Sequence, residues 1–221
     1  MKKNATLQIV LVDDHPILRQ AMKQFIDSEP DFQVIGESGN AIGAIDLARQ
    51  LKPQAMVLDI SLAGSNGIDA AREIKRVSSG TKILMFSMHD ENVYAPRALE
   101  AGASGYIMKQ EAPEKVIVAL RKILAGGVYL SEALESRMLK GLKGGASAGS
   151  LSPLEVLSNR EFEVFGLIGK GRATREIADT MKLSVKTVES HRAHIKEKMN
   201  LENGNQLVHV AIQWQLEQLC R

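Results

Sequence analysis

The sequence has very little cysteine and no long apolar run. Cys220 is the single cysteine among 221 residues, so the chain has no intrachain disulfide and no pair of cysteines to bind a metal. Its apolar stretches are too short to span a bilayer, and the N-terminal segment MKKNATLQ lacks the apolar core of a signal peptide. We therefore expect a cytoplasmic protein.

An excess of charge of one sign is also missing over most of the chain. Lysine plus arginine number 28 and aspartate plus glutamate number 26, so bulk charge indicates no polyanion-binding tail. A local excess does occur between Lys170 and Lys198, where we count eight basic and four acidic residues, and this segment can face an anion. At 44% hydrophobic and 24% charged residues, the chain suits one large or two small ordinary domains, and we predict two.

Hydrophobic periodicity divides the chain into an α/β part and a helical part. Apolar runs typical of strands recur at residues 7–12, 33–36, 55–60, 82–86 and 105–108, with helical spacing between them. Because parallel strands need helical crossovers, this alternation predicts a doubly wound, five-stranded parallel sheet with helices on both sides. From Leu157 onward the signals are only helical, which predicts a second, smaller all-α domain.

The first predicted helix and the segment between the domains carry distinct signals. Pro16 stands where a first helical turn tolerates proline. The inward face of that helix is predicted to carry Ile17, Leu18, Ala21, Met22, Phe25 and Ile26. Around residues 131–150 the pattern fails, and the segment KGLKGGASAGS predicts a flexible linker because it is rich in glycine, serine and alanine.

Polar residues close four of the five apolar runs. Asp13 and Asp14 follow the first run, Asp59 falls near the end of the third, Ser87 follows the fourth and Lys109 the fifth. Ligands of an open parallel sheet bind beyond the carboxyl ends of its strands, so these side chains are expected at one edge. Three carboxylates in one cleft repel one another unless a hard cation neutralises them, which indicates Mg²⁺.

Asp59 is the predicted acceptor of a phosphoryl group. It stands alone at the end of a central strand, whereas the Asp13 and Asp14 pair on the neighbouring strand is available to hold the metal. An aspartyl phosphate would form there while the metal and the Lys109 ammonium neutralise the transferring oxygens. The segment GKGRATR at 169–175 lacks the spacing of a Walker-type loop, so the phosphoryl group must come from another molecule.

Four motifs together resemble the receiver domain of two-component response regulators, over about residues 7–127. They are VDD at 12–14, VLDISLAGSNG at 57–67, MFS at 85–87 and GYIMK at 105–109. The resemblance implies phosphotransfer from a sensor histidine kinase to Asp59 and a pairing of Lys109 with the phosphoryl oxygens. It also implies Mg²⁺ bound by Asp13, Asp14, Asp59 and the backbone carbonyl of Ser61.

The same resemblance implies that Ser87 and Tyr106 form a switch pair. We expect Ser87 to move toward the phosphoryl oxygens and Tyr106 to rotate from an exposed to a buried position. Two positions depart from the family pattern. Ala63 replaces the usual proline four residues after the acceptor, which affects loop rigidity, and Met88 follows the switch hydroxyl, where it could slow access to the site.

The C-terminal segment has the signals of a helix-turn-helix. Ser158 and Glu161 form a predicted capping box at the start of one helix, a second helix is expected from Thr174, and a third from Val185, capped by Ser184. The third helix is predicted to bury Val185, Val188, Ile195 and Met199. Its outward side chains face a DNA major groove in one interpretation and form an ordinary solvated surface in the other.

The sequence from Leu157 to Leu201 resembles the LuxR-type helix-turn-helix, which would cover about residues 153–218. The two domains together, joined by a linker at 128–152, resemble a NarL/FixJ-type response regulator. This implies regulation of transcription by binding double-stranded promoter DNA. The side chains expected nearest base edges are Lys186, Glu189, Ser190 and Ala193, and those expected at phosphates are Thr187, Arg192 and Lys196. We also expect a homodimer on an inverted repeat when the protein is phosphorylated.

Two other functions share parts of this pattern, and several lone residues allow more than one interpretation. A phosphatase or phosphotransferase with an aspartate nucleophile is disfavoured, because Asp59-Ile60-Ser61 lacks the second aspartate of haloacid-dehalogenase-type enzymes. A regulator with a relic pocket is disfavoured because all pocket residues are present. His15 either tunes the metal site or faces solvent at a helix start, His89 either influences dephosphorylation or has no role there, and Trp214 fits a core or a subunit interface better than a ligand platform.

Overall fold

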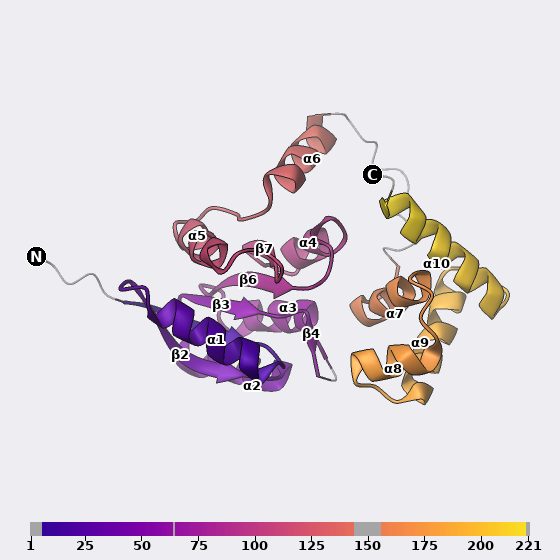
Figure 1. Ribbon diagram of the computed structural model, residues 1–221, viewed down its shortest axis with the longest axis horizontal. Helices are drawn as coiled ribbons and strands as arrows, with labels where there is room; N and C mark the ends of the chain where they lie inside the picture. Colours follow the sequence, from indigo (N-terminus) through magenta and orange to yellow (C-terminus); the bar gives the residue numbers. More distant parts are fainter. Residues whose placement is uncertain (1–5, 64, 144–155, 220–221) are drawn as a thin grey trace, which may run out of the picture. The chain divides into compact units, whose positions relative to one another are not determined.

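The computed structural model describes residues 6–63, 65–143 and 156–219 (Figure 1). Backbone proximity divides the chain into two compact units, Met1–Gly145 and Ala146–Arg221. Residues 144–152 of the predicted linker, residues 153–155 at the start of the predicted DNA-binding domain, and Cys220 lie outside the described residues. In the ranges that are described, no helix is both long and apolar enough to cross a membrane.

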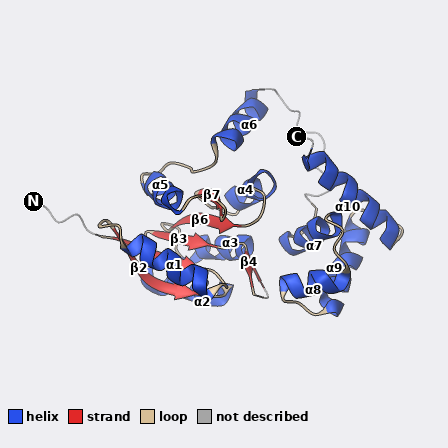
Figure 2. Ribbon diagram, viewed as in Figure 1, coloured by secondary structure: helices blue, strands red, loops and turns tan. Residues whose placement is uncertain are grey.

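The first unit is built on a five-stranded parallel sheet (Figure 2). Its strands are β1 (Leu7–Val12), β2 (Phe32–Ser38), β3 (Ala55–Leu58), β6 (Lys82–Ser87) and β7 (Gly105–Met108), in the spatial order β2-β1-β3-β6-β7. The prediction of a doubly wound α/β fold is confirmed. The order reverses at β1 and β3, so their carboxyl ends flank the crevice where ligands of such sheets bind.

Helices cover the sheet as the alternation predicted. They are α1 (Pro16–Asp27), α2 (Ala41–Leu51), α3 (Gly67–Val77), α4 (Glu91–Glu100) and α5 (Pro113–Leu124). Alternate strand residues such as Leu11 and Val57 pack with α1 and α5 in one core cluster, whereas α2 and α3 pack against each other. The central strands β3 and β6 are buried on both faces, as parallel strands between two helical layers must be.

Two details of this unit differ from the predictions. The third strand ends at Leu58 rather than Ile60, because a small antiparallel hairpin, β4 (Ser61–Leu62) with β5 (Ser65–Asn66), follows it. On α1, Ile17 is 86% exposed and Ala21 is also exposed, whereas Met22 and Ile26 are buried. Ile17 and Ala21 lie about 100° around the helix from the stripe of Leu18, Met22 and Ile26 that meets the sheet, so the apolar face was predicted too wide.

The prediction of a flexible linker was wrong for residues 132–143, which form helix α6 (Glu132–Lys143). Its first turns are held to the rest of the first unit. Leu134 is buried, Lys122 Nζ lies 2.6 Å from Glu135 Oε1, and Ser131 hydrogen-bonds Glu91 at the start of α4. The glycine-rich composition belongs to residues 140–150, whereas SEALESRML at 131–139 has helical spacing that the average over the whole segment concealed.

The second unit contains α7 (Asn159–Gly169), α8 (Thr174–Met181), α9 (Val185–Lys198) and α10 (Gly204–Leu219). The predicted helix starts are confirmed, including the reciprocal capping box of Ser158 and Glu161 and the Ser184 cap of α9. Lys182 adopts a left-handed conformation that ends α8 and lets α9 begin three residues later, which completes the helix-turn-helix.

The core of the second unit explains its tryptophan and corrects one prediction. Trp214 of α10 lies 5.5 Å from Phe162 and 5.6 Å from Phe165 between ring centroids, as expected for a core aromatic residue. Val188 and Ile195 of α9 are buried as predicted. Val185, in the first turn of α9, is 43% exposed, so its predicted burial was wrong.

Candidate functional site

The structure brings the predicted pocket residues together at the carboxyl edge of the sheet. Asp13 follows β1 and Asp59 follows β3, and both are buried. Lys109, directly after β7, places Nζ 2.6 Å from Asp13 Oδ2 and 2.7 Å from Asp59 Oδ2. Because the lysine side chain is only 5% exposed, it is a desolvated cation paired with two carboxylates.

Burial and charge shift the pKa values of Asp59 and Lys109. Burial raises the pKa of Asp59 above its ordinary value, and the neighbouring Lys109 charge only partly offsets this effect. For Lys109, burial by itself would lower the pKa, but Asp59 and Asp13 outweigh it and raise the pKa overall. Lys109 therefore stays protonated and keeps a positive charge beside the predicted acceptor.

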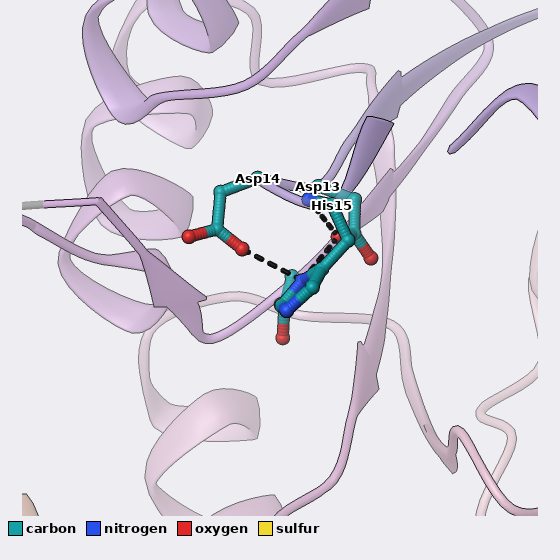
Figure 3. Close-up of side chains that lie close together, drawn as sticks. Asp13, Asp14 and His15 are labelled. Atoms are coloured by element: carbon teal, nitrogen blue, oxygen red, sulfur yellow. Dashed lines mark hydrogen bonds and ion pairs between the residues drawn. The ribbon is translucent and has the colours of Figure 1, made fainter. Parts of the chain in front are cut away.

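Asp13, Asp14 and His15 form a second part of the pocket (Figure 3). The imidazole Nδ1 of His15 lies 3.1 Å from Asp13 Oδ1 and 2.8 Å from Asp14 Oδ1. His15 is both the exposed residue at the start of α1 and a neighbour of the carboxylates, so the two interpretations of this residue are compatible. Asp13, Asp14 and Asp59 supply oxygen atoms of the kind that Mg²⁺ prefers, and the donor set fits that ion.

The hairpin after β3 shapes the other side of the pocket. The backbone N–H of Ser61 donates to Asp59 Oδ1 at 3.3 Å, and the Ser61 hydroxyl lies 2.8 Å from His89 Nε2. The N–H of Gly67 donates to the carbonyl of Ile60 at 2.7 Å, which draws the start of α3 against the backbone of the predicted acceptor. His89 also stacks on Tyr94 of α4 with ring centroids 4.4 Å apart.

Ser87 and Tyr106 lie next to this hairpin and are both fully buried. The Tyr106 hydroxyl donates to the carbonyl of His89 at 2.8 Å, and burial raises the pKa of Tyr106. Of the two orientations expected of Tyr106, the structure has the buried one. The ring points inward, and the bond from its hydroxyl to the His89 carbonyl holds it beside α4.

The third helix of the second unit carries the residues predicted to contact DNA. Lys186, Glu189, Ser190 and Ala193 are exposed, whereas Thr187, Arg192 and Lys196 are half-buried. His191 is half-buried, and burial lowers its pKa, which agrees with a packing role for that ring. Lys186, Ser190 and Ala193 lie opposite Val188 and Ile195, with Glu189 at the side of the helix, so α9 can present them to a groove.

Sequence reasoning missed the contact that attaches α9 to α7. Glu161 is buried and accepts hydrogen bonds from the Ser158 N–H and from Lys198 Nζ, both at 2.7 Å. His194 Nδ1 lies 3.8 Å from Oε1, the other carboxylate oxygen of Glu161. The capping-box spacing revealed the first of these bonds, but no local signal pairs residues 161 and 198.

A doubly wound domain with a buried acidic pocket and an ion-paired lysine, followed by a helix-turn-helix unit, defines a phosphoacceptor-type regulator that binds DNA. Models of two families match this chain, the response regulator receiver domain over residues 9–121 and the bacterial regulatory proteins of the luxR family over residues 155–211. The chain therefore belongs to the response regulators that combine a receiver domain with a LuxR-type DNA-binding domain, and it is a two-component transcriptional regulator.

Relatives of similar length support this assignment. The chain is 32% identical to the oxygen regulatory protein NreC of Staphylococcus carnosus, across 95% of this chain and 99% of that protein. It is 29% identical to the transcriptional regulatory protein DegU of Brevibacillus brevis, across 91% of each chain. These proteins are transcriptional response regulators rather than metabolic enzymes.

Solved structures agree with the fold. A LuxR-family two-component response regulator from Aurantimonas sp. is 36% identical with a TM-score of 0.59, covering 63% of this chain and 99% of that one. RcsB from Salmonella enterica serovar Typhimurium, solved bound to a promoter with the phosphomimetic BeF₃⁻, is 25% identical with a TM-score of 0.57. That comparison covers 92% of this chain and 97% of RcsB.

Proposed function

We propose that Asp59 accepts a phosphoryl group from the phosphohistidine of a sensor histidine kinase. The observation that carries this proposal is the buried contact of Lys109 with both Asp59 and Asp13. In the transfer, an Asp59 carboxylate oxygen attacks phosphorus, the new P–O bond forms as the P–N bond breaks, and the electron pair returns to the donor imidazole. Asp59 is the attacking group because it lies at the centre of the pocket.

Lys109 stabilises the charge that develops on the phosphoryl oxygens. Its ammonium already lies within 2.7 Å of Asp59 Oδ2, so a small shift would place it against a phosphoryl oxygen. Mg²⁺, held by Asp13, Asp14, Asp59 and the carbonyl of Ser61, supplies further positive charge when it is bound. We also propose that the receiver supports its own phosphorylation by small donors and its own dephosphorylation, while the chain as a whole acts as a regulator.

The proposed output is binding of a homodimer to an inverted repeat in promoter DNA. Lys186, Glu189, Ser190 and Ala193 would approach base edges, and Thr187, Arg192 and Lys196 would contact phosphates. A receiver domain at 7–127, a connecting segment at 128–152 that includes α6, and a DNA-binding domain at 153–218 remain our proposed boundaries. RcsB bound to promoter DNA provides a precedent in the same fold.

Coupling between the two domains is proposed to begin at Ser87. Its buried hydroxyl accepts a hydrogen bond from the His89 N–H, and a new bond to a phosphoryl oxygen would change the contacts of His89 and Tyr106 and thereby the start of α4. Through Ser131, that same turn of α4 contacts the segment leading to α6. The proposed result is release of a masked α9 and dimerisation, with a coupling of about 1–3 kcal/mol, or roughly 5–150-fold in DNA affinity.

Intact-mass spectrometry after incubation with acetyl phosphate and Mg²⁺ tests the chemical step. The wild-type chain should gain one phosphoryl group and Asp59→Asn none. Asp46→Asn, which removes a half-exposed carboxylate on α2, is the matched control and should be phosphorylated like the wild type. Full phosphorylation of Asp59→Asn would show that another residue is the acceptor. DNA affinity that is equal for the phosphorylated and unphosphorylated chains would reject the coupling.

A further inference from the structure

His15 places a nitrogen atom among the oxygens of the acidic pocket (Figure 3). One donor atom from each of Asp13, Asp14, His15 and Asp59 lies within 4.8 Å of all the others. Three of the four are carboxylate oxygens, which suit Mg²⁺, whereas an imidazole nitrogen suits transition ions such as Zn²⁺ and Ni²⁺. The pocket of this chain therefore contains a donor that Mg²⁺ does not require.

The spacing of these donors matches the spacing of ligands around one ion. In an octahedral site with bonds of about 2.1 Å, neighbouring ligand atoms lie about 3.0 Å apart and opposite ones about 4.2 Å apart. The nitrogen of His15 lies 2.8 Å from Asp14 Oδ1 and 3.1 Å from Asp13 Oδ1. His15 thus has the separation of a neighbouring ligand from two carboxylates at once, and the 4.8 Å limit for the whole set is only slightly wider than an opposite pair.

Other contacts of the pocket hold this arrangement, and the ion pair of Lys109 with Asp13 uses the carboxylate oxygen that does not face His15. Lys109 contacts Oδ2 of Asp13, whereas His15 faces Oδ1. The backbone N–H of His15 donates to Asp13 Oδ1 at 2.8 Å, which holds the turn between β1 and α1. The imidazole makes no side-chain cap for α1 and is 64% exposed, so the ring can adjust to an ion while the carboxylates stay in place.

We propose that His15 is a metal ligand, and that it makes this pocket select Co²⁺ and Zn²⁺ over Mg²⁺. The inference rests on the proposed function, because it assigns a further ligand to the metal site that would assist phosphotransfer. A ring nitrogen binds a metal through its free lone pair, so the ring would hold the ion on Nδ1 and carry its proton on Nε2. All titrations are made at one fixed pH of about 8.

Calorimetric titration of the chelator-treated full chain with MgCl₂, CoCl₂ and ZnCl₂ measures this preference. Loss of even an outer partner of a ligand costs about 10–100-fold in metal affinity, so His15→Gln should weaken Co²⁺ and Zn²⁺ binding by at least about tenfold. The affinity for Mg²⁺ should change much less, and the Co²⁺ to Mg²⁺ preference should fall accordingly. His15→Ala is the second variant, and unchanged thermal unfolding of either one establishes that the pocket remains folded.

His209→Gln controls for ordinary surface histidines, because His209 is exposed on α10 of the other unit. It should leave all three affinities unchanged. A direct readout uses Mn²⁺ as a paramagnetic probe, since electron spin-echo modulation detects a coordinated ¹⁴N nucleus. The modulation should be present in the wild type and in His209→Gln, and absent in both His15 variants.

Three results would overturn the assignment: a metal preference that His15→Gln does not alter, a ¹⁴N signal that survives in the His15 variants, or no such signal in the wild type. These outcomes are separable from failure of the proposed function. If the wild type is phosphorylated with Mg²⁺ while His15 has no effect on metal preference, the phosphoacceptor role stands and the ligand assignment fails. If the metal preference falls as expected but Asp59 takes no phosphoryl group, the assignment of His15 as a ligand stands and the phosphoacceptor role fails.

Discussion

Replacement of Gly67 by alanine should displace the predicted phosphoacceptor. A Cβ at residue 67 would lie 1.9 Å from the carbonyl oxygen of Asp59 and 2.8 Å from its carbonyl carbon. Both are backbone atoms at the end of a central strand, so no side chain can rotate to relieve the contact. Separations below 3.0 Å do not persist for a real Cβ, so either the start of α3 or the Asp59 backbone must move.

The required movement sets the expected magnitude. Extending the contact to an acceptable distance needs a displacement of about 1 Å, and a misplacement of about 1 Å in a reacting group can cost about 10²-fold in rate. Gly67→Ala should therefore lower the rate of phosphorylation by acetyl phosphate about 100-fold. Forcing an extra methyl group into a packed region should also lower the free energy of unfolding by about 1–3 kcal/mol.

The assay compares Gly67→Ala with Gly80→Ala, in which the added Cβ meets no atom within 4 Å. Rates come from intact-mass spectrometry at fixed acetyl phosphate and Mg²⁺, and stabilities from urea unfolding followed by circular dichroism. Gly80→Ala should match the wild type in rate. If Gly67→Ala also matched the wild type in both measurements, the close approach of α3 to Asp59 would not constrain the site, and the reasoning would be refuted.

Three further predictions concern the lysine, the DNA contacts and the link between α7 and α9. Lys109→Met should slow phosphorylation of Asp59 by about 10²–10³-fold, the usual loss for a donor that stabilises developing charge, and an unaltered rate in the mass assay would remove Lys109 from the mechanism. Arg192→Ala and Lys196→Ala should weaken binding to all DNA sequences and reduce the slope of log affinity against log salt by about 0.9 each; unchanged slopes would reject the docking of α9. Burial raises the pKa of Glu161, but hydrogen bonds from Lys198 and Ser158 outweigh it and lower the pKa below 4.5. Glu161 therefore stabilises the second unit above the unfolded-state pKa, and this contribution is lost as pH falls through the lower folded-state pKa. Thermal unfolding followed by the fluorescence of Trp214 should show this loss in the wild type and much less of it in Glu161→Gln, and identical pH profiles would contradict the linkage.

Helix starts and strand positions were largely predictable because they depend on local chemistry. Ser158, Ser184 and Pro16 act on backbone groups within one turn, and each begins or caps a helix where the sequence placed it. Apolar runs likewise marked all five strands of the sheet. These signals need only a few neighbouring residues, so a linear sequence contains them in full.

The errors have a common cause, which is that exposure depends on which neighbours a helix meets. Ile17 lies on the side of α1 away from the stripe that meets the sheet, and Val185 is 43% exposed in the first turn of α9; a periodic pattern does not reveal where the packing partners lie. The partner of the Tyr106 hydroxyl, which is the carbonyl of His89, is likewise a contact between distant parts of the chain that no local pattern gives.

The sequence by itself determined the class of the protein and the chemistry of its pocket. Carboxylates and a lysine at the ends of apolar runs have to meet at one edge, because parallel strands all direct their carboxyl ends the same way. Only the tertiary structure decided which atoms touch: Lys109 with Asp59, 50 residues apart, His89 with Ser61, 28 apart, and Lys198 with Glu161, 37 apart. Periodicity specifies which face or edge a residue occupies, whereas a contact of about 3 Å depends on how whole helices and strands pack.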